Sequence, residues 1–265
     1  MRTVLLLAGL VGMAVVPVSG RAAADYDNFS RIGKFEVAVD GRVDAQARLY
    51  HSVSPPAFLI LTQAFEDAVV LLPGKSQVAA VSAEKVEARE DSAAIASGVS
   101  LRNMGEFRVA ADQTVSLQFD GHSLELRPKP YLLGLQTAQD LKTYDPLYRR
   151  RAEEYQPDPN VMRLLQTFEG KAQVRVYFGS WCPFCQENVP KLMKLQELLG
   201  DTGITFDYWG LPRDFNNDPT ATDAGIKQVP TFVVTVEGEE KGRIVGRDTQ
   251  QPEANLQRLL SRPGR

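Results

Sequence analysis

One stretch decides the fold of the C-terminal half of the chain: Val176-Tyr-Phe-Gly-Ser-Trp-Cys-Pro-Phe-Cys185. The apolar run from Val174 to Phe178 predicts a buried strand. Residues 183–199 predict a helix, with a proline at the first position, where its missing N–H is not needed. Cys182 therefore falls where a strand gives way to a helix, and Cys185 follows one turn later.

The position of the two cysteines indicates thiol–disulfide chemistry. The N–H groups in the first turn of a helix have no partners inside the helix, and the helix dipole favours negative charge there. We therefore expect the pKa of Cys182 to be lowered, which makes it the attacking thiolate. Cys185 is expected to be the shielded thiol that attacks the mixed disulfide formed at Cys182. No cofactor and no metal are predicted.

Two other interpretations of the Cys-x-x-Cys pair are weaker. It could be half of a zinc site, but zinc requires four ligands, and the only histidines, His51 and His122, lie far away in the sequence. It could be a structural disulfide, but so short a loop restricts the unfolded chain little. With only 2 cysteines in the chain, reactivity explains the pair better than stapling.

Strands and helices alternate around this motif. This pattern predicts an α/β domain over residues 158–265, with a central sheet covered by helices. The further strands are expected at residues 204–209, 231–236 and 243–245, and the further helices at residues 220–226 and 252–260.

Residues 25–130 predict a β-rich domain, a sandwich or a barrel, of unknown role. Asp-Gly pairs at Asp40-Gly41 and Asp120-Gly121 separate alternating runs and predict two hairpins, the first resuming as a strand from Val43 to Tyr50. Apolar runs at residues 57–62 and 68–72 predict further strands.

Residues 131–157 are expected to be an ordered helical connector. Thr137 followed by Asp140 is typical of a helix start, and Pro146 should break or kink that helix. The run of three arginines from Arg149 is interpreted as a solvated helical face rather than a binding patch. Asp158, followed by proline, should cap the next helix.

The first 24 residues have the order of a secretory signal peptide: a positive start, a short apolar run and small residues near Ala24. The run is shorter than the about 20 residues that span a membrane, although an uncleaved tether stays open as an alternative. The chain is therefore expected to be exported, most plainly to the periplasm, and soluble after cleavage. Its net charge of −3 gives no reason to expect a nucleic-acid partner.

Residues from about 171 to 262 resemble the thioredoxin superfamily, in particular its exported thiol–disulfide oxidoreductases. The resemblance rests on residues 176–185, on Pro190 within the helix and on the stretch Gly225–Phe232. It implies a cis Val229–Pro230 bond beside the disulfide. An ordinary trans proline at the start of a strand is the other interpretation.

The resemblance also implies a client-binding surface made by Trp181, Phe184, Val229 and Pro230; Trp181 could otherwise be a plain core residue. The chain departs from the family at Val176, where thioredoxins carry a buried acid. That acid helps to move the proton of the resolving thiol, so either Glu187 or water is expected to replace it, or that step is slower here.

Together these features predict an α+β two-domain protein that reduces or isomerises disulfides in exported proteins. Reductase or isomerase is favoured over oxidase, because the interval between Cys182 and Pro230 is too short for the large helical insertion of the dedicated oxidases. The expected partners are disulfide-containing clients and a membrane electron donor, with a second copy bound through the N-terminal domain as a further candidate. The alternative is a client-binding or assembly protein in which the β domain is primary.

Overall fold

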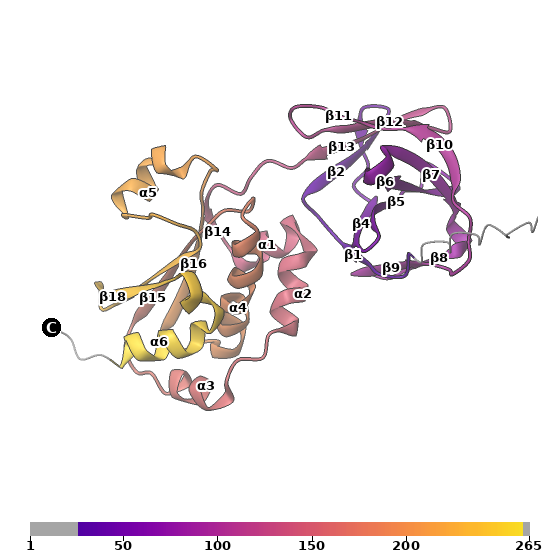
Figure 1. The fold of residues 1–265 in the computed structure, drawn as a ribbon. Coiled ribbons are helices and arrows are strands. Elements are labelled where there is room, and N and C mark those ends of the chain that lie inside the picture. Colours follow the sequence, from indigo (N-terminus) through magenta and orange to yellow (C-terminus); the bar gives the residue numbers. More distant parts are fainter. Residues whose placement is uncertain (1–25, 262–265) are drawn as a thin grey trace, which may run out of the picture.

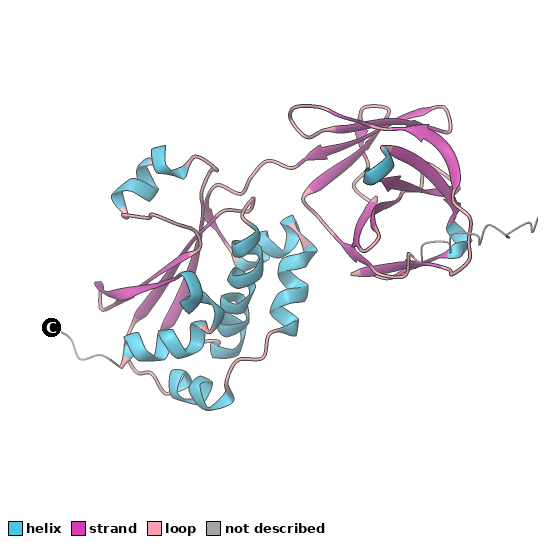
Figure 2. Ribbon diagram, viewed as in Figure 1, coloured by secondary structure: helices cyan, strands magenta, loops and turns pink. Residues whose placement is uncertain are grey.

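The computed structural model describes residues 26–261, so the expected signal peptide, residues 1–24, lies outside the described part. An all-β unit and an α/β unit lie side by side, joined by one extended segment (Figure 1). Almost all helices gather in the second unit (Figure 2). The predicted α+β two-domain fold, with a β-rich N-terminal part and an α/β C-terminal part, is confirmed.

The first sheet of the β domain has eight antiparallel strands. They are β1 (Phe29–Arg31), β4 (Arg48–Val53), β5 (Pro56–Leu61), β6 (Asp67–Leu72), β7 (Gln77–Ser82), β8 (Val86–Ala88), β9 (Ser92–Ile95) and β10 (Arg102–Glu106). Their spatial order is β10-β7-β6-β5-β4-β1-β9-β8. The apolar runs in β5 and β6 are explained by two separate cores, one on each face of this sheet.

The second sheet has five strands and covers one of those faces. They are β2 (Phe35–Val39), β3 (Arg42–Val43), β11 (Arg108–Val109), β12 (Val115–Phe119) and β13 (His122–Pro128), in the order β11-β12-β13-β2-β3. Both predicted Asp-Gly hairpins form here, between β2 and β3 and between β12 and β13. Asp40, Gly41, Asp120 and Gly121 all have positive φ, as the tight hairpin turns require.

One predicted strand of the β domain is wrong. Residues 43–50 were expected to form a single strand, but β3 ends at Val43 and β4 begins at Arg48 in the other sheet. Asp44 makes the turn between them: its carboxylate accepts the N–H of Gln46, and its carbonyl accepts the N–H of Ala47. This Asx turn stops the pairing and carries the chain from one sheet to the other.

The C-terminal sheet has five strands in the order β14-β16-β15-β17-β18. They are β14 (Gly134–Gln136), β15 (Ala172–Phe178), β16 (Ile204–Gly210), β17 (Thr231–Val236) and β18 (Glu239–Val245). The helices are α1 (Ala138–Tyr144), α2 (Pro146–Glu154), α3 (Pro159–Gln166), α4 (Pro183–Leu199), α5 (Pro219–Asp223) and α6 (Pro252–Leu260). The larger core lies on the face covered by α1–α4 and α6, and α5 lies over a smaller apolar cluster. None of the helices in the described range is long and apolar enough to cross a membrane.

The expected connector packs onto the C-terminal domain. Strand β14 joins its sheet, and Leu141, Tyr148 and Ala152 of α1 and α2 enter its main core. Thr137 and Asp140 form the predicted capping box. Pro146 ends the first helix rather than kinking it, because Asp145 caps a second helix through the N–H of Leu147.

The two domains meet at the junction of α1 and α2. The Gly33 N–H donates to Asp145 Oδ1 across 3.0 Å. A Cβ on Gly33 would lie 2.6 Å from the Pro146 ring, so only glycine allows this approach. The interpretation of the arginine run as a solvated face is wrong for Arg149, whose Nη2 lies 2.8 and 2.9 Å from the two carboxylate oxygens of Asp91 in the β domain.

Candidate active site at the start of helix α4

The dithiol lies where β15 turns into α4. Cys182 is the N-cap of the helix, and its sulfur accepts the backbone N–H of Cys185 across 3.4 Å. The Cys182 N–H donates to the Gly179 carbonyl across 3.0 Å, which closes the turn. Both cysteines are free thiols. The structure therefore places the pair at the strand-to-helix junction that the sequence predicted.

The environment of Cys182 favours its thiolate. The pKa is lowered to about 6, chiefly by a hydrogen bond from the Cys185 thiol and with help from the backbone N–H groups of Cys185 and Phe184. Burial opposes this effect, since only 8% of the residue is exposed. A thiol with such a pKa is mostly ionised at neutral pH and is ready for nucleophilic attack.

Cys185 has the opposite environment. Its side chain is fully buried, and its sulfur accepts the Gly179 N–H across 3.4 Å. Burial, and then the hydrogen bond with Cys182, raise the pKa of this thiol far above its ordinary range. The two cysteines thus differ as an attacking and a resolving thiol must.

The loop before β17 closes the other side of the dithiol. The Val229–Pro230 bond is cis, as the resemblance implies. The Val229 carbonyl oxygen lies 3.8 Å from the Cys182 sulfur, and the next residue, Pro230, is buried. Thr231 Oγ1 donates to the Gln228 carbonyl across 2.7 Å and fastens the loop. Val229 is therefore next to the reactive sulfur, and the cis bond to the buried Pro230 follows directly after it.

The two aromatic residues of the motif lie differently. Phe184 is 38% exposed beside the cysteines. Trp181 is half-buried: its indole N–H donates to the Leu211 carbonyl across 3.0 Å, and its ring stacks on Phe215 with the ring centroids 6.3 Å apart. Trp181 is thus neither a plain core residue nor fully exposed. Its ring is held in one position next to Cys182.

The Cys-x-x-Cys motif alone did not indicate which other residues contact the Trp181 ring. The Arg213 guanidinium lies 5.3 Å from the centroid of the Trp181 ring and 6.0 Å from that of Tyr131. A Cβ on Gly179 would lie 2.4 Å from the Trp181 ring, so this glycine leaves the space that the ring fills. Gly179 stands in the quoted stretch, but Arg213 and Tyr131 are distant in sequence and carry no local signal.

The structure also bears on which group replaces the buried acid that is missing at Val176. Val176 is fully buried in the central strand, where a carboxylate would have been expected from the resemblance. Glu187 is exposed on α4. The expectation that it replaces the buried acid is therefore wrong, because its carboxylate faces solvent rather than the buried thiol.

The described residues contain no group of three or more His, Cys, Asp or Glu side chains that could hold a metal. Both histidines lie in the β domain, where His51 packs against Phe58 and His122 lies 2.7 Å from an Asp40 carboxylate oxygen. Neither approaches the cysteine pair as a zinc ligand would.

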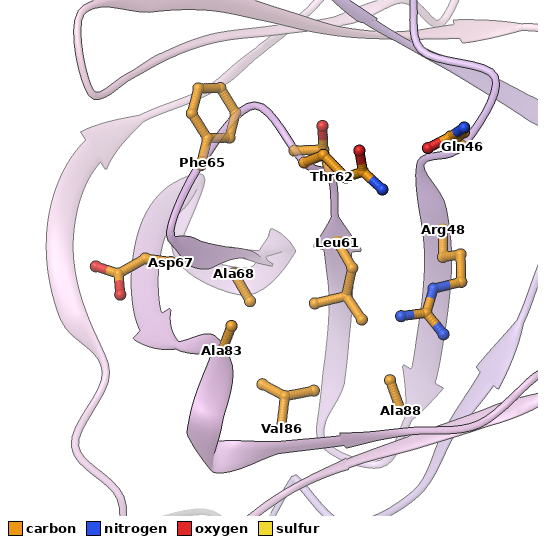
Figure 3. A pocket seen from close by; sticks show the side chains of 11 residues that line it. Gln46, Arg48, Leu61, Thr62, Phe65, Asp67, Ala68, Ala83, Val86 and Ala88 are labelled. Carbon is orange, nitrogen blue, oxygen red and sulfur yellow. The ribbon is translucent and has the colours of Figure 1, made fainter.

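A hollow of about 560 Å³ opens in the β domain over β4, β5, β6 and β8 (Figure 3). Arg48, Leu61 and Val86 contribute to its lining, and Asp67 at its edge pairs with Arg102 across 2.6 Å. Both cysteines lie in the other domain, and neither lines this hollow. It is a place where the β domain could hold another molecule.

Comparison with known proteins finds a match for the domain that carries the two cysteines. Residues 162–260 match the family model named Thioredoxin. No curated protein sequence matches the chain.

Several solved structures are distantly similar. A protein of unknown function from Pseudomonas aeruginosa is 20% identical, over 48% of this chain and 81% of its own, with a TM-score of 0.32. A thioredoxin from Fasciola hepatica is 22% identical, over 37% of this chain and 90% of its own, with a TM-score of 0.28. The oxidised mitochondrial thioredoxin 3 from Saccharomyces cerevisiae is 17% identical, over 41% and 98%, with a TM-score of 0.25. Residues 162–260 of this chain are a thioredoxin-like domain, and it carries the pair Cys182 and Cys185 at the start of its helix α4.

Proposed function

We propose that this protein is a thiol–disulfide oxidoreductase that reduces or isomerises disulfides in exported proteins. The observation that carries the proposal is the contrast between the two thiols, since the pKa of Cys182 is lowered to about 6 while that of the buried Cys185 is raised. A helix start that stabilises one thiolate and buries the second thiol is suited to attack followed by resolution.

The reaction has two exchanges. The Cys182 thiolate attacks a client disulfide, forms a mixed disulfide and releases one client sulfur as a thiolate. Cys185 then loses its proton and attacks the Cys182 sulfur. This forms the Cys182–Cys185 disulfide and breaks the bond to the client, so that the client gains two electrons and the dithiol loses two.

Client binding is assigned to the surface around Cys182. The exposed ring of Phe184 and the fixed ring of Trp181 offer apolar contact beside the sulfur. The loop at Val229 and Pro230 lies against the same sulfur. An extended client segment could pair with the backbone of this loop while its disulfide meets Cys182.

The direction and the setting of the reaction rest on further inferences. Between α4 and β17 the chain forms only β16, a short turn of 3-10 helix and the five-residue α5, which leaves no large helical insertion of the kind found in dedicated oxidases. The signal-like residues 1–24 support export to the periplasm. A membrane electron donor would return the dithiol to its reduced form, and the β domain would dock clients or a second copy of the chain.

Reduction of insulin disulfides tests the activity. The wild-type protein with a chemical reductant should accelerate the reduction, and Cys182→Ala should abolish the acceleration. A Cys182→Ala variant that is as active as the wild type would sink the proposal. Light scattering tests the dimer separately, since a clean monomer at working concentration contradicts it.

A binding or assembly protein is the second candidate function. It is favoured by the hollow in the β domain, which has mixed polar and apolar lining and no link to the cysteines. Comparing client binding by the wild type and by the double variant Cys182→Ala/Cys185→Ala separates the two functions. If the double variant restores the function of cells that lack the protein as well as the wild type does, the binding role is favoured.

A further inference from the structure

The second thiol–disulfide exchange, in which Cys185 attacks, requires a negatively charged sulfur inside the buried core. Cys185 must become a thiolate to attack the mixed disulfide, although it is fully buried and its pKa is raised by that burial. Within residues 26–261 its backbone donor is the Gly179 N–H, at 3.4 Å. The neighbouring strand offers Val176, which has no polar group. Some other donor would be needed to stabilise this thiolate.

Helix α2 brings a phenol into the same cluster. Tyr148 is fully buried and belongs to the core cluster that contains Val176, Cys182 and Cys185. Helix α2 packs directly against α4, the helix that carries the dithiol. Among the described residues, the Tyr148 hydroxyl has no hydrogen-bond partner. A buried hydroxyl without a partner costs stability, so its retention calls for an explanation.

The titratable groups near enough to influence the ionisation of Tyr148 are Cys185, Asp145, Tyr144 and Cys182. Burial raises the pKa of Tyr148 most, and the charge on Cys185 is the next largest cause. The phenol therefore keeps its proton over the whole physiological range. It cannot act as a base toward Cys185, but it can donate a hydrogen bond to a sulfur that becomes negative.

We propose that Tyr148 is a positioning residue for the resolving step, whose hydroxyl donates a hydrogen bond to the Cys185 thiolate as that thiolate attacks the mixed disulfide. This inference rests on the proposed function. Cys185 first gives its proton to solvent, and the client sulfur that leaves as a thiolate takes a proton from solvent in turn. The sulfur–sulfur bond to Cys182 forms as the bond to the client breaks, and Tyr148 keeps its own proton throughout.

Asp145 holds the N-terminus of α2, the helix that carries Tyr148. It is buried at the N-terminus of α2, and its Oδ1 accepts the N–H groups of Leu147 and Gly33. Its carboxylate is thereby engaged in capping the helix that carries Tyr148 and in holding the β domain. The tyrosine, with its free hydroxyl in the cluster of the two cysteines, is the group left to serve Cys185.

The test uses 5,5′-dithiobis(2-nitrobenzoate), a small disulfide that releases a coloured thiolate at each exchange. The first release reports the attack by Cys182, and the second reports the displacement by Cys185. In Tyr148→Phe the first release should be unchanged. The second should be slower by about tenfold or more, because a hydrogen bond to a charged group is lost, and its pH profile should move to higher pH.

The matched control is Tyr208→Phe. Tyr208 is a fully buried tyrosine of the same cluster, and its hydroxyl donates to Gln196 Oε1 across 2.9 Å. Its second release should equal that of the wild type. Equal slowing in both variants, or an unchanged second release in Tyr148→Phe, would overturn the proposal.

Two further readouts keep the outcome clear. Thermal unfolding of Tyr148→Phe should have the same midpoint as the wild type or a higher one, since the lost hydroxyl has no partner; a lower midpoint contradicts the proposal. Replacement of Tyr148 by 3-fluorotyrosine makes the phenol a stronger donor and should accelerate the second release, whereas a rate equal to the wild type counts against it. A missing first release in the wild type would instead contradict the proposed function.

Discussion

The backbone N–H of Cys185 points at the Cys182 sulfur across 3.4 Å. The residue that resolves the mixed disulfide therefore also stabilises the thiolate that forms it. Its own thiol is turned into the core beneath, where the Gly179 N–H is its backbone partner. One helical turn thus gives two chemically identical side chains opposite tendencies to ionise.

The reactivity of Cys182 should follow its lowered pKa. Alkylation by iodoacetamide should rise with pH through a midpoint at about 6 and then level off. An ordinary thiol titrates near pH 8.5. Mass spectrometry after a short exposure should place the label on Cys182 and not on the buried Cys185. A midpoint near 8.5 would show that the helix start does not stabilise the thiolate.

The same pKa shift links stability to pH. The folded-state pKa of Cys182 lies below that of an ordinary thiol, so its contribution to the stability of the reduced protein is complete above the ordinary value of about 8.5. It is lost as the pH falls through about 6. Urea unfolding of the reduced protein should show this loss relative to Cys182→Ala. Parallel curves for the two proteins between pH 5 and 9 would contradict the assignment.

The reduction potential should lie between those of a strong reductant and a strong oxidant. A thiolate that is stabilised in the reduced form raises the potential, because oxidation removes that stabilisation. We expect a value between about −270 mV, as for thioredoxin, and about −120 mV, as for a dedicated oxidase. Equilibration with glutathione measures it. A potential of about −120 mV or higher would contradict the assignment as a reductase or an isomerase.

Gly179 should be required for the placement of Trp181. In Gly179→Ala the new Cβ would lie 2.4 Å from the indole ring, so the ring or the turn must shift. We expect a loss of about 1–3 kcal/mol of unfolding free energy, as for overpacking in general, and a changed tryptophan fluorescence. Gly74→Ala is the control, because its Cβ would meet nothing within 4 Å. A Gly179→Ala protein as stable as that control would show that the ring adapts freely.

The local parts of this architecture could be predicted from the sequence. A strand, two cysteines and a proline at the first helical position are enough to place the dithiol at the start of α4. The Asp-Gly pairs fixed two hairpins, since both residues of such turns need positive φ. These features depend on a few neighbouring residues and on general rules of backbone geometry.

The long-range parts could not be predicted. The crossing at Asp44 between two sheets leaves no break in the alternating pattern of residues 43–50. Arg213 reaches Trp181 and Tyr131 only through the tertiary fold. In the sequence Tyr148 has the pattern of an ordinary apolar position on a helix, and only its place in the core cluster that holds both cysteines gives its hydroxyl a role.

The attachment of the β domain should depend on Asp91. In Asp91→Asn the bidentate partner of Arg149 becomes neutral, and the half-buried guanidinium loses its best contact. We expect a loss of about 1 kcal/mol for so partly exposed a pair and a wider distribution of domain orientations in small-angle scattering. Glu90→Gln is the control: Glu90 also reaches Arg149, at 3.0 Å, but is far more exposed. Equal behaviour of the two variants would mean that the contact at Asp91 does not hold the domains.

The division of labour between the two cysteines is tested most directly by trapping the intermediate. Cys185→Ala should accumulate a mixed disulfide between Cys182 and a disulfide-containing peptide, visible by mass spectrometry as one peptide fragment bound at Cys182. The wild type should instead release the peptide and contain a Cys182–Cys185 disulfide. If Cys185→Ala forms no adduct, or releases the peptide as fast as the wild type, then Cys182 is not the attacking thiol or Cys185 is not the resolving one, and the account is wrong.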